Sequence, residues 1–294
     1  MAETFPVVDA HVHLWNPRQL HLSWLADIPR LNRPYGLLDY REQTRGLPIE
    51  GIVYVEVGAT AEEALSEARY IANLAQEEPL LKAIVAAAPV ERGEAVRPHL
   101  ETLLSISPLI KGVRRNIQDE AEPDFCLQPD FVAGVRLLAE YHLSFDLCIK
   151  HRQLPSVIEL VRRCPYTTFI LDHLAKPDIQ HHQLEPWKTN LRALAELPNV
   201  ACKLSGMVTE ADHANWQPAD LEPYIASVFE SFGPDRVMFG SDWPVVLLAS
   251  SYRRWYETVA SLSSFTSRLP ISERRKLWAE NATRFYMKFD DQVR

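Results

Sequence analysis

Two histidines, His11 and His13, stand two residues apart in the run Val-Asp-Ala-His-Val-His-Leu-Trp near the start of the chain. Apolar and β-branched residues surround them, so this run predicts a buried strand. Side chains two apart in a strand point the same way, which places the two imidazoles side by side. Such a pair is half of a metal site, or a pair of proton-transfer and hydrogen-bonding groups aimed at one substrate atom.

Further polar residues stand where later apolar runs end. They are Glu56, Arg114, Asn116, His151, Asp172, His173, Lys203, Ser205 and Asp242. A buried charge at such a place needs a partner, either an opposite charge inside the protein or a substrate. Glu56 and Lys203 fit both interpretations, and Asp242 taken alone also fits a turn or helix-cap residue. Of the adjacent Arg114 and Arg115 only one can face inward, and we favour Arg114.

Strands and helices that would position these residues alternate along the chain. After the first strand, apolar runs predict strands at residues 51–58, 82–90, 110–117, 143–150, 167–174, 200–205 and 236–241. The segments between them predict helices at 61–76, 94–105, 129–141, 154–163, 186–197 and 220–232. An amphipathic helix over about 272–287 would close or cap the assembly.

Eight strands that alternate with helices predict an α/β protein whose parallel sheet closes into a (β/α)8 TIM barrel. An open, doubly wound sheet is the alternative, but no glycine-rich phosphate turn supports it. No linker or internal repeat divides the chain, so residues 1–294 are expected to form one domain. In such barrels the site lies at the carboxyl ends of the strands, where the polar residues gather.

Composition narrows the class of protein. The 294 residues carry a net charge of -8 and an isoelectric point near 5.7, without the basic stripe of a nucleic-acid partner. Four dispersed cysteines predict reduced, buried thiols, not a zinc knuckle or a disulfide framework. No apolar run approaches the length of a membrane span, and the first residues do not read as a signal peptide, so a cytoplasmic protein is expected.

Six motifs spread over nearly the whole chain carry a family resemblance. They are Val-Asp-Ala-His11-Val-His13-Leu-Trp, Lys-Gly-Val-Arg114-Arg-Asn-Ile-Gln, Phe-Ile-Leu-Asp172-His173-Leu-Ala-Lys-Pro177, Cys-Lys203-Leu-Ser-Gly206, Met-Phe-Gly-Ser-Asp242-Trp-Pro244 and Trp-Ala-Glu-Asn281-Ala-Thr-Arg-Phe-Tyr286. In this order they resemble the amidohydrolase superfamily. Within it, they resemble the amidohydrolase-related branch of sugar lactonases, such as the L-fuconolactonases and L-rhamnonolactonases.

That resemblance implies a metal-dependent-hydrolase type of barrel that opens a small cyclic ester. Asp242 stands where the superfamily keeps its general base, and His11, His13 and His173 where it keeps metal-binding or substrate-polarising histidines. Arg114 replaces the bridging residue of two-metal members, so a binuclear site is not expected. Two forms of the catalyst stay open. One needs no metal, and the other holds a single divalent ion, Zn²⁺ or Mn²⁺, on His11 and His13 with His173 or Asp242.

The expected partner is a small-molecule sugar lactone, an aldonolactone such as L-fucono- or L-rhamnonolactone. Its carbonyl must be polarised, a water deprotonated and the leaving ring oxygen protonated. Asp242, His173, His11 and His13 are the expected catalytic residues. The expected substrate-binding residues are Arg114, Lys203, His151, Glu56, Trp24 and Asn116. Simple packing of Trp24 fits its position equally well.

The sequence is also compatible with other functions. Within the same branch, a 2-pyrone-4,6-dicarboxylate lactonase would need several cations for two carboxylates, and the supply near the fourth strand is thin. A metal-dependent decarboxylase is a further alternative. A non-enzymatic barrel is disfavoured, because every candidate position still holds a residue type that does chemistry. Formation of a homo-oligomer also stays open.

Overall fold

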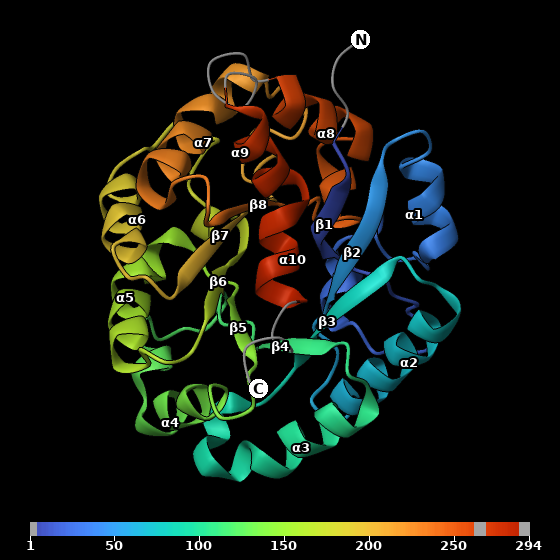
Figure 1. The fold of residues 1–294 in the computed structure, drawn as a ribbon, viewed down its shortest axis with the longest axis vertical. Helices are drawn as coiled ribbons and strands as arrows, with labels where there is room; N and C mark the ends of the chain where they lie inside the picture. Colours follow the sequence, from blue (N-terminus) through green and yellow to red (C-terminus); the bar gives the residue numbers. More distant parts are fainter. Residues whose placement is uncertain (1–4, 262–268, 288–294) are drawn as a thin grey trace.

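Eight parallel strands form one sheet in the order β1 to β8. The computed structural model describes residues 5–261 and 269–287. The strands are β1 (Val7–Val12), β2 (Ile49–Val55), β3 (Leu81–Ala87), β4 (Ile110–Arg114), β5 (Ser144–Leu147), β6 (Phe169–Leu171), β7 (Val200–Leu204) and β8 (Val237–Phe239). Each strand pairs with the next in the chain, so that the sheet curls into a nearly closed ring (Figure 1).

The ring closes between β1 and the segment that follows β8. The amide of Asp242 donates to the carbonyl of His11 at 2.9 Å, and the amide of His13 donates to the carbonyl of Trp243 at 2.7 Å. Asp9 reinforces this seam, because its Oδ1 accepts from the amides of His11 and Ser241 at 3.2 and 2.8 Å. The (β/α)8 barrel expected from the alternation is therefore confirmed.

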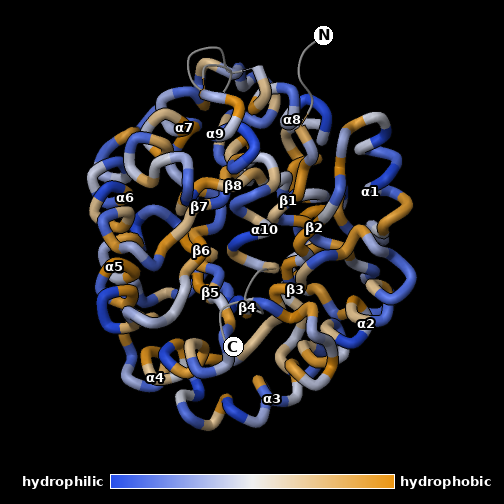
Figure 2. Tube along the Cα trace, viewed as in Figure 1, coloured by the Kyte–Doolittle hydropathy of each residue, from blue (hydrophilic) through white to orange (hydrophobic). Residues whose placement is uncertain are grey.

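Helices surround the barrel (Figure 1). They are α1 (Leu37–Gln43), α2 (Ala64–Glu77), α3 (Arg97–Ile106), α4 (Pro129–Leu137), α5 (Leu154–Arg163), α6 (Trp187–Ala195), α7 (Pro218–Phe232) and α8 (Tyr252–Ser261). Figure 2 shows hydrophobic and hydrophilic segments alternating along these helices, as expected of helices that bury one face. No helix among the described residues has both the length and the apolar character needed to cross a bilayer.

The interior of the barrel has two layers of different chemistry. Near the amino ends of the strands, the side chains form an apolar cluster that includes Val8, Ala10, Val53, Val85, Ile170, Ala201 and Met238. Further along, inward-facing positions carry the buried charges Arg114, Asp146, Asp172 and Lys203. Because side chains alternate between the two faces of a strand, Ile170 and Asp172 share the interior, as do Ala201 and Lys203.

A helical C-terminal segment lies across the barrel (Figure 1). It consists of α9 (Ile271–Arg275), a π-helical turn at Lys276–Glu280 and α10 (Asn281–Tyr286), over the residues where one amphipathic helix was expected. Ala282 and Tyr286 of α10 pack into the apolar interior cluster. The Asn281 side-chain amide donates to the carbonyls of Pro234 and Val237 at 2.8 and 2.7 Å, which places α10 at the amino end of β8.

Sequence and structure differ most at the sixth strand. A strand over residues 167–174 was expected, but β6 ends at Leu171. The backbone then turns, and residues 173–176 all have positive φ between 48° and 62°. The structure also adds two helices, α1 and α8, for which the sequence pattern gave no prediction. Both differences lie at the carboxyl ends of strands or in the connections that follow them.

Candidate active site

The imidazoles of His11, in β1, and of His13, directly after it, meet inside the barrel mouth, where His11 Nε2 lies 3.1 Å from His13 Nε2. Both side chains are buried. His13 Nδ1 lies 2.8 Å from the carbonyl oxygen of Val55. A carbonyl only accepts, so this contact places the His13 proton on Nδ1 and leaves a lone pair on Nε2 when the ring is neutral.

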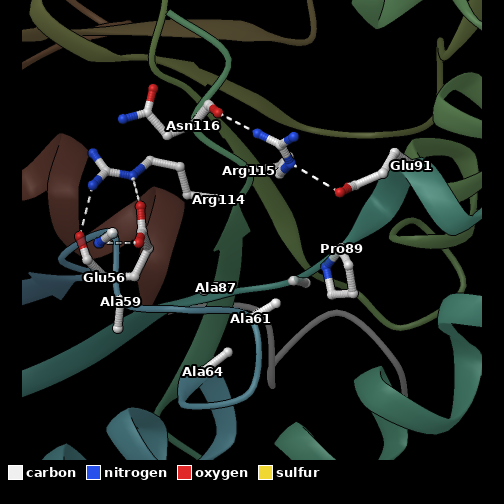
Figure 3. Close-up of a pocket in the computed structure, with 12 residues that line it drawn as sticks. Glu56, Ala59, Ala61, Ala64, Ala87, Pro89, Glu91, Arg114, Arg115 and Asn116 are labelled. Carbon is white, nitrogen blue, oxygen red and sulfur yellow. Dashed lines mark hydrogen bonds and ion pairs between the residues drawn. The ribbon is translucent and has the colours of Figure 1, made fainter. Parts of the chain in front are cut away.

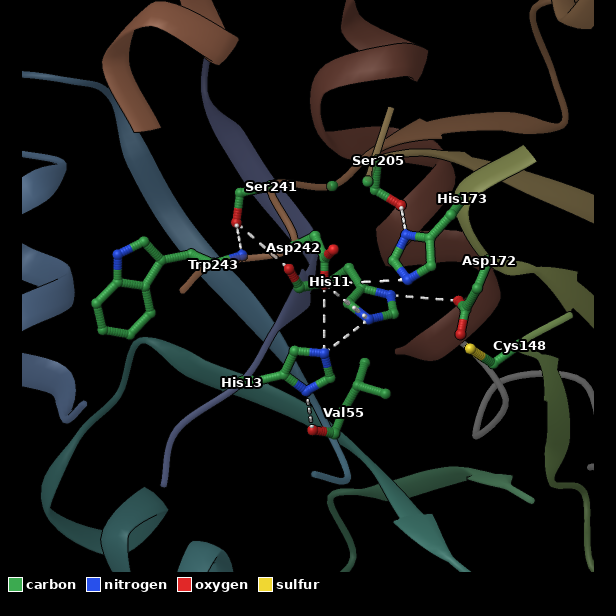
Figure 4. Close-up of polar contacts among 12 residues, drawn as sticks. His11, His13, Val55, Cys148, Asp172, His173, Ser205, Ser241, Asp242 and Trp243 are labelled. Atoms are coloured by element: carbon green, nitrogen blue, oxygen red, sulfur yellow. Dashed lines mark hydrogen bonds and ion pairs between the residues drawn. The ribbon is translucent and has the colours of Figure 1, made fainter. Parts of the chain in front are cut away.

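Asp242 faces both rings from the segment after β8 (Figure 4). Its Oδ1 lies 3.4 Å from His13 Nε2, 3.7 Å from His11 Nε2 and 3.9 Å from His173 Nε2. Its backbone φ is 59°, a left-handed conformation that Asp tolerates better than most residues. Burial alone would raise the pKa of Asp242, but the neighbouring His173, His13 and His11 hold it well below its usual range. The group is therefore a carboxylate at neutral pH.

His173 is the third imidazole of the cluster and follows β6. Its Nδ1 lies 2.9 Å from Ser205 Oγ on the loop after β7. Burial lowers the pKa of His173 to about 4, so the ring is neutral at physiological pH. Gly206 provides the space for this ring, because a Cβ at that position would lie 2.5 Å from His173 Nδ1.

A network of buried charges contacts the histidine cluster through His11. Asp172 Oδ1 lies 3.2 Å from His11 Nδ1 and 3.0 Å from Lys203 Nζ. Lys203 Nζ also donates to Asp146 Oδ2 at 2.5 Å. Since Lys203 is fully buried and absent from the pocket wall, the structure does not bring it to the substrate position that was expected. Lys203 lies instead in an internal ion pair, the other interpretation that the sequence allowed.

Arg114 and Glu56 form an ion pair beside this network. Arg114 Nε donates to Glu56 Oε1 at 2.6 Å, Nη2 donates to the Glu56 carbonyl at 2.6 Å, and Nη1 donates to Asp172 Oδ2 at 3.2 Å. The inward-facing arginine is therefore Arg114, as expected. Arg115 points away and pairs with Glu91 at 3.1 Å.

A cavity of about 500 Å³ opens above the cluster. Among its lining residues are His13, Trp24, Arg114, Asn116, Gln118, Cys148, His173, Lys176 and Asp242. Trp24, Arg114 and Asn116 thus lie where substrate-binding residues were expected, although their roles stay predictions. His151 does not line the cavity, because its Nδ1 faces the carbonyl oxygen of Lys176 at 2.9 Å.

Glu56 lies in the wall of a neighbouring cavity of about 350 Å³ (Figure 3). Alanines form much of its surface, and Gly58, Arg114 and Asn116 belong to both cavities. The Glu56 carboxylate is occupied by Arg114 and by the Gly58 amide at 2.6 Å. Its place is therefore that of a structural partner of Arg114.

Sequence reasoning missed several residues of this site. Lys176 stands in a motif quoted for the family resemblance but received no role, and Gln118 received none either. Asp146 is a charge in an apolar strand, the same signal that singled out Lys203, and it was overlooked. Asp9, next to the histidine pair, was not recognised as the residue that holds the seam of the barrel.

The donor set of the cluster fits one divalent cation. The structure groups His11, His13 and Asp242, and also His11, Asp172 and His173, with ligand atoms within 4.8 Å of one another. Ligand atoms of a tetrahedral zinc ion at about 2.1 Å lie about 3.4 Å apart. The three distances among His11 Nε2, His13 Nε2 and Asp242 Oδ1 are 3.1, 3.4 and 3.7 Å. Lone pairs of His13 and Asp242 that face each other also favour a cation between them.

The chain matches a known family over most of its length. A family model described as Amidohydrolase matches residues 8–288. The chain therefore belongs to the amidohydrolase family, which confirms the resemblance inferred from the motifs.

Curated relatives refine this assignment. An L-fucono-1,5-lactonase of Burkholderia multivorans is 34% identical over 292 residues, which are 95% of each chain. An L-rhamnono-gamma-lactonase of Scheffersomyces stipitis is 26% identical and aligns with 96% of this chain and 98% of its own length. A 2-pyrone-4,6-dicarboxylate hydrolase of Comamonas testosteroni is 27% identical but aligns with only 46% of this chain and 46% of its own.

A solved structure has the same fold throughout. The crystal structure of an amidohydrolase from Burkholderia multivorans with bound zinc superposes with a TM-score of 0.86. It is 31% identical, and the match covers 95% of this chain and 98% of that one.

Proposed function

We propose that this protein hydrolyses a sugar lactone, an aldonolactone such as L-fucono- or L-rhamnonolactone, to its sugar acid. The observation that carries the proposal is the convergence of Asp242 with His11, His13 and His173 at the mouth of a 500 Å³ cavity. The lactonases among the curated relatives support a carboxylic ester hydrolase acting on this class of substrate. The cytoplasmic location stays a prediction.

Asp242 is the proposed general base. Its carboxylate takes a proton from the attacking water, and the same proton is then delivered to the ring oxygen as the ester bond breaks. His173 is neutral at physiological pH and offers a hydrogen bond to the substrate or to the water. Trp24 and Asn116 line the cavity where the hydroxyl groups of a sugar would lie.

One divalent ion, held by His11, His13 and Asp242 with His173 nearby, is the form of the catalyst that we favour. The His11, His13 and Asp242 ligand atoms lie 3.1 to 3.7 Å apart, which suits one such ion. Held there, such an ion would supply Lewis acidity to the attacking water and to the ester carbonyl. The contact of His13 Nδ1 with Val55 and that of His11 Nδ1 with Asp172 orient both rings for such a role.

The dicarboxylate-lactonase alternative fits the cavity less well. Two carboxylates on a substrate require at least two cations with free hydrogen-bond donors. Of the two cations in the cavity wall, Arg114 is already bound to Glu56 and Asp172. The cavity therefore favours a substrate with little or no negative charge.

Turnover of L-fucono-1,5-lactone and of other aldonolactones, followed with a pH indicator, tests the proposal. The enzyme is assayed before and after exhaustive chelation, and its bound metal is counted by elemental analysis. Loss of activity on chelation, restored by one equivalent of Zn²⁺ or Mn²⁺, supports the metal-dependent form. Full activity without metal supports the metal-free form, and no turnover of any aldonolactone overturns the proposed function.

A further inference from the structure

Lys176 is a cation of the main cavity that has no part in the hydrolysis steps proposed for Asp242 and the histidines. Two cationic side chains, Arg114 and Lys176, are among the residues that line this cavity. Arg114 directs its donors to the Glu56 carboxylate and carbonyl and to Asp172, so little of its hydrogen-bonding capacity remains for a substrate. The Lys176 side chain, by contrast, is not bound to a carboxylate among the described residues.

The ammonium group of Lys176 has a neutral partner. Its Nζ donates to Gln118 Oε1 at 2.6 Å. Within residues 5–261 and 269–287, no carboxylate lies within ion-pair distance of it, and Asp242 and Glu210 act on it only from farther away. An ammonium group has three donors, and among the described residues this one has a single hydrogen-bond partner, so two donors remain on a side chain that lines the cavity. Lys203 shows the contrast, because two aspartates contact its ammonium group directly.

The backbone holds Lys176 in place firmly. Residues 173–176 form the left-handed turn after β6, with the Lys176 amide donating to the His173 carbonyl at 2.7 Å. The carbonyl of Lys176 in turn accepts from His151 Nδ1 at 2.9 Å. One turn therefore brings both His173 and Lys176 to the cavity, and His151 fixes that turn from outside.

We propose that Lys176 binds the carbonyl oxygen of the lactone and, after ring opening, the carboxylate that forms from it. This inference rests on the proposed lactone hydrolysis and names the group that holds the reacting ester. During the reaction water adds to the carbonyl carbon, the bond between that carbon and the ring oxygen breaks, and the ring oxygen gains a proton. The products are one carboxylate, one hydroxyl and one proton released to solvent.

The charge on the oxygen explains why a cation belongs there. The carbonyl oxygen is neutral in the lactone, negative in the tetrahedral intermediate and shares a negative charge in the product. A fixed ammonium group stabilises the later species more than the first. Lys176 would therefore favour ring opening, and it would also make the enzyme sensitive to inhibition by its own product.

Three variants test this role. Lys176→Met removes the charge and keeps much of the apolar stem, whereas Lys176→Arg keeps the charge. Lys150→Met is the matched control, because the Lys150 ammonium group already pairs with Asp119 at 2.7 Å at the same end of the barrel. The readouts are kcat, KM, inhibition by the sodium aldonate of the substrate, and calorimetric binding of sodium L-fuconate, with the melting temperature as a check of folding.

Lys176→Met is expected to weaken aldonate binding roughly tenfold or more and to lower kcat/KM by a similar factor, the usual effect of a lost charge-assisted hydrogen bond. Lys176→Arg should restore part of the binding, and Lys150→Met should behave as the wild type. Unchanged aldonate binding in a folded, lactone-hydrolysing Lys176→Met variant overturns the inference and leaves the proposed function intact. A shifted acid limb of the pH profile with unchanged aldonate binding also overturns it, because Lys176 would then act through Asp242. A wild-type enzyme that neither hydrolyses an aldonolactone nor binds L-fuconate overturns both.

Discussion

Asp242 combines an unusual backbone with a central place in the site. Its φ of 59° lies in the left-handed region, where Asp and Asn are the side chains best tolerated after Gly. Asp242→Asn therefore changes the chemistry with little cost to the backbone. We expect kcat to fall roughly a thousandfold, because an amide does not accept the proton of the attacking water.

Circular dichroism and the melting temperature of the Asp242→Asn variant serve as controls of folding. Both should stay near the wild-type values, since Asn keeps the shape of the side chain. A folded variant with near-normal kcat would remove Asp242 from the role of general base.

Gly206 gives a second prediction, for the placement of His173. Its φ is +60°, and an added Cβ would lie 2.5 Å from His173 Nδ1. Gly206→Ala should therefore displace the His173 ring and lower kcat/KM more than tenfold, in addition to a backbone cost of about 1 kcal/mol. Activity and urea denaturation measure the two effects separately.

The matched control is Gly233→Ala. Gly233 has a similar φ of +66°, but nothing lies within 4 Å of an added Cβ. It should lose stability and keep its activity. Equal activities in the two variants would show that the space beside His173 does not matter for the reaction.

Single residues were predictable where they stand in a recognisable pattern. His11 and His13 follow from their spacing in a strand. The role expected of Asp242 follows from the family resemblance, because its position after the last strand also fits a turn or helix-cap residue. Lys176 did not follow, because its place depends on a left-handed turn that nothing in the local sequence specifies. His151 was placed in the site because it follows a strand, but the same turn receives its imidazole.

For helices and strands, hydrophobic periodicity predicted the bounds of helices better than it predicted the ends of strands. The helix expected at 154–163 has those bounds in α5, whose apolar residues face the core at helical spacing. Strands were expected to be longer than they are, as at 167–174 against Phe169–Leu171. Apolar character continues into the turns after the strands because the catalytic end is buried too, so hydropathy alone does not mark where a strand stops.

The C-terminal helix α10 gives the next prediction. Tyr286 reaches from it into the barrel, and its hydroxyl donates to Asp146 Oδ2 at 2.7 Å. Tyr286→Phe should lower the free energy of unfolding by about 2 kcal/mol, because a buried carboxylate loses a donor. Urea denaturation measures this loss, and kcat should change little since Lys203 still holds Asp146.

Tyr224→Phe is a suitable comparison. The Tyr224 hydroxyl donates to a neutral carbonyl, that of Asp178, at 3.3 Å. Its removal should cost about 1 kcal/mol or less. A larger loss in Tyr224→Phe than in Tyr286→Phe would argue against a stabilising link between α10 and the charges inside the barrel.

For the whole molecule, the alternation of strand and helix was enough to predict the barrel, because few other folds accommodate eight such repeats. The arrangement of the interior charges was not predictable. Asp146 lies in β5, Asp172 directly follows β6 and Lys203 lies in β7, and their pairing follows from the register of these three neighbouring strands, which the sequence does not specify.

Stability of the whole molecule should depend on pH through Glu67. Burial, with a contribution from the nearby Glu56 charge, raises the pKa of Glu67 from 4.5 to about 8. Folding then takes up a proton between these values, so this group stabilises the fold fully below pH 4.5 and less as pH rises through 8. The expected loss of unfolding free energy over this whole pH range, relative to Glu67→Gln, is on the order of 5 kcal/mol.

Urea denaturation of the wild type and of Glu67→Gln at several pH values between 5 and 9 checks this dependence. The Gln side chain keeps an oxygen to accept from the Tyr54 hydroxyl and the Val57 amide, as Glu67 does at 2.7 and 3.0 Å. The wild-type curve should fall relative to the variant as the pH rises. Two parallel curves would mean that Glu67 is ionised in the folded protein.

Closure of the barrel has a consequence for how the protein folds. The bonds that join β1 to the segment after β8 connect residues more than two hundred positions apart, as in the contact of Ser241 with Asp9 across 232 positions. Those same segments carry His11, His13 and Asp242, so the catalytic cluster is assembled by contacts between segments that lie far apart in the sequence. Such contacts are costly in chain entropy and form late. Recovery of activity during refolding should therefore trail the recovery of helical signal, and a ribosome must release nearly the whole chain before the enzyme can work.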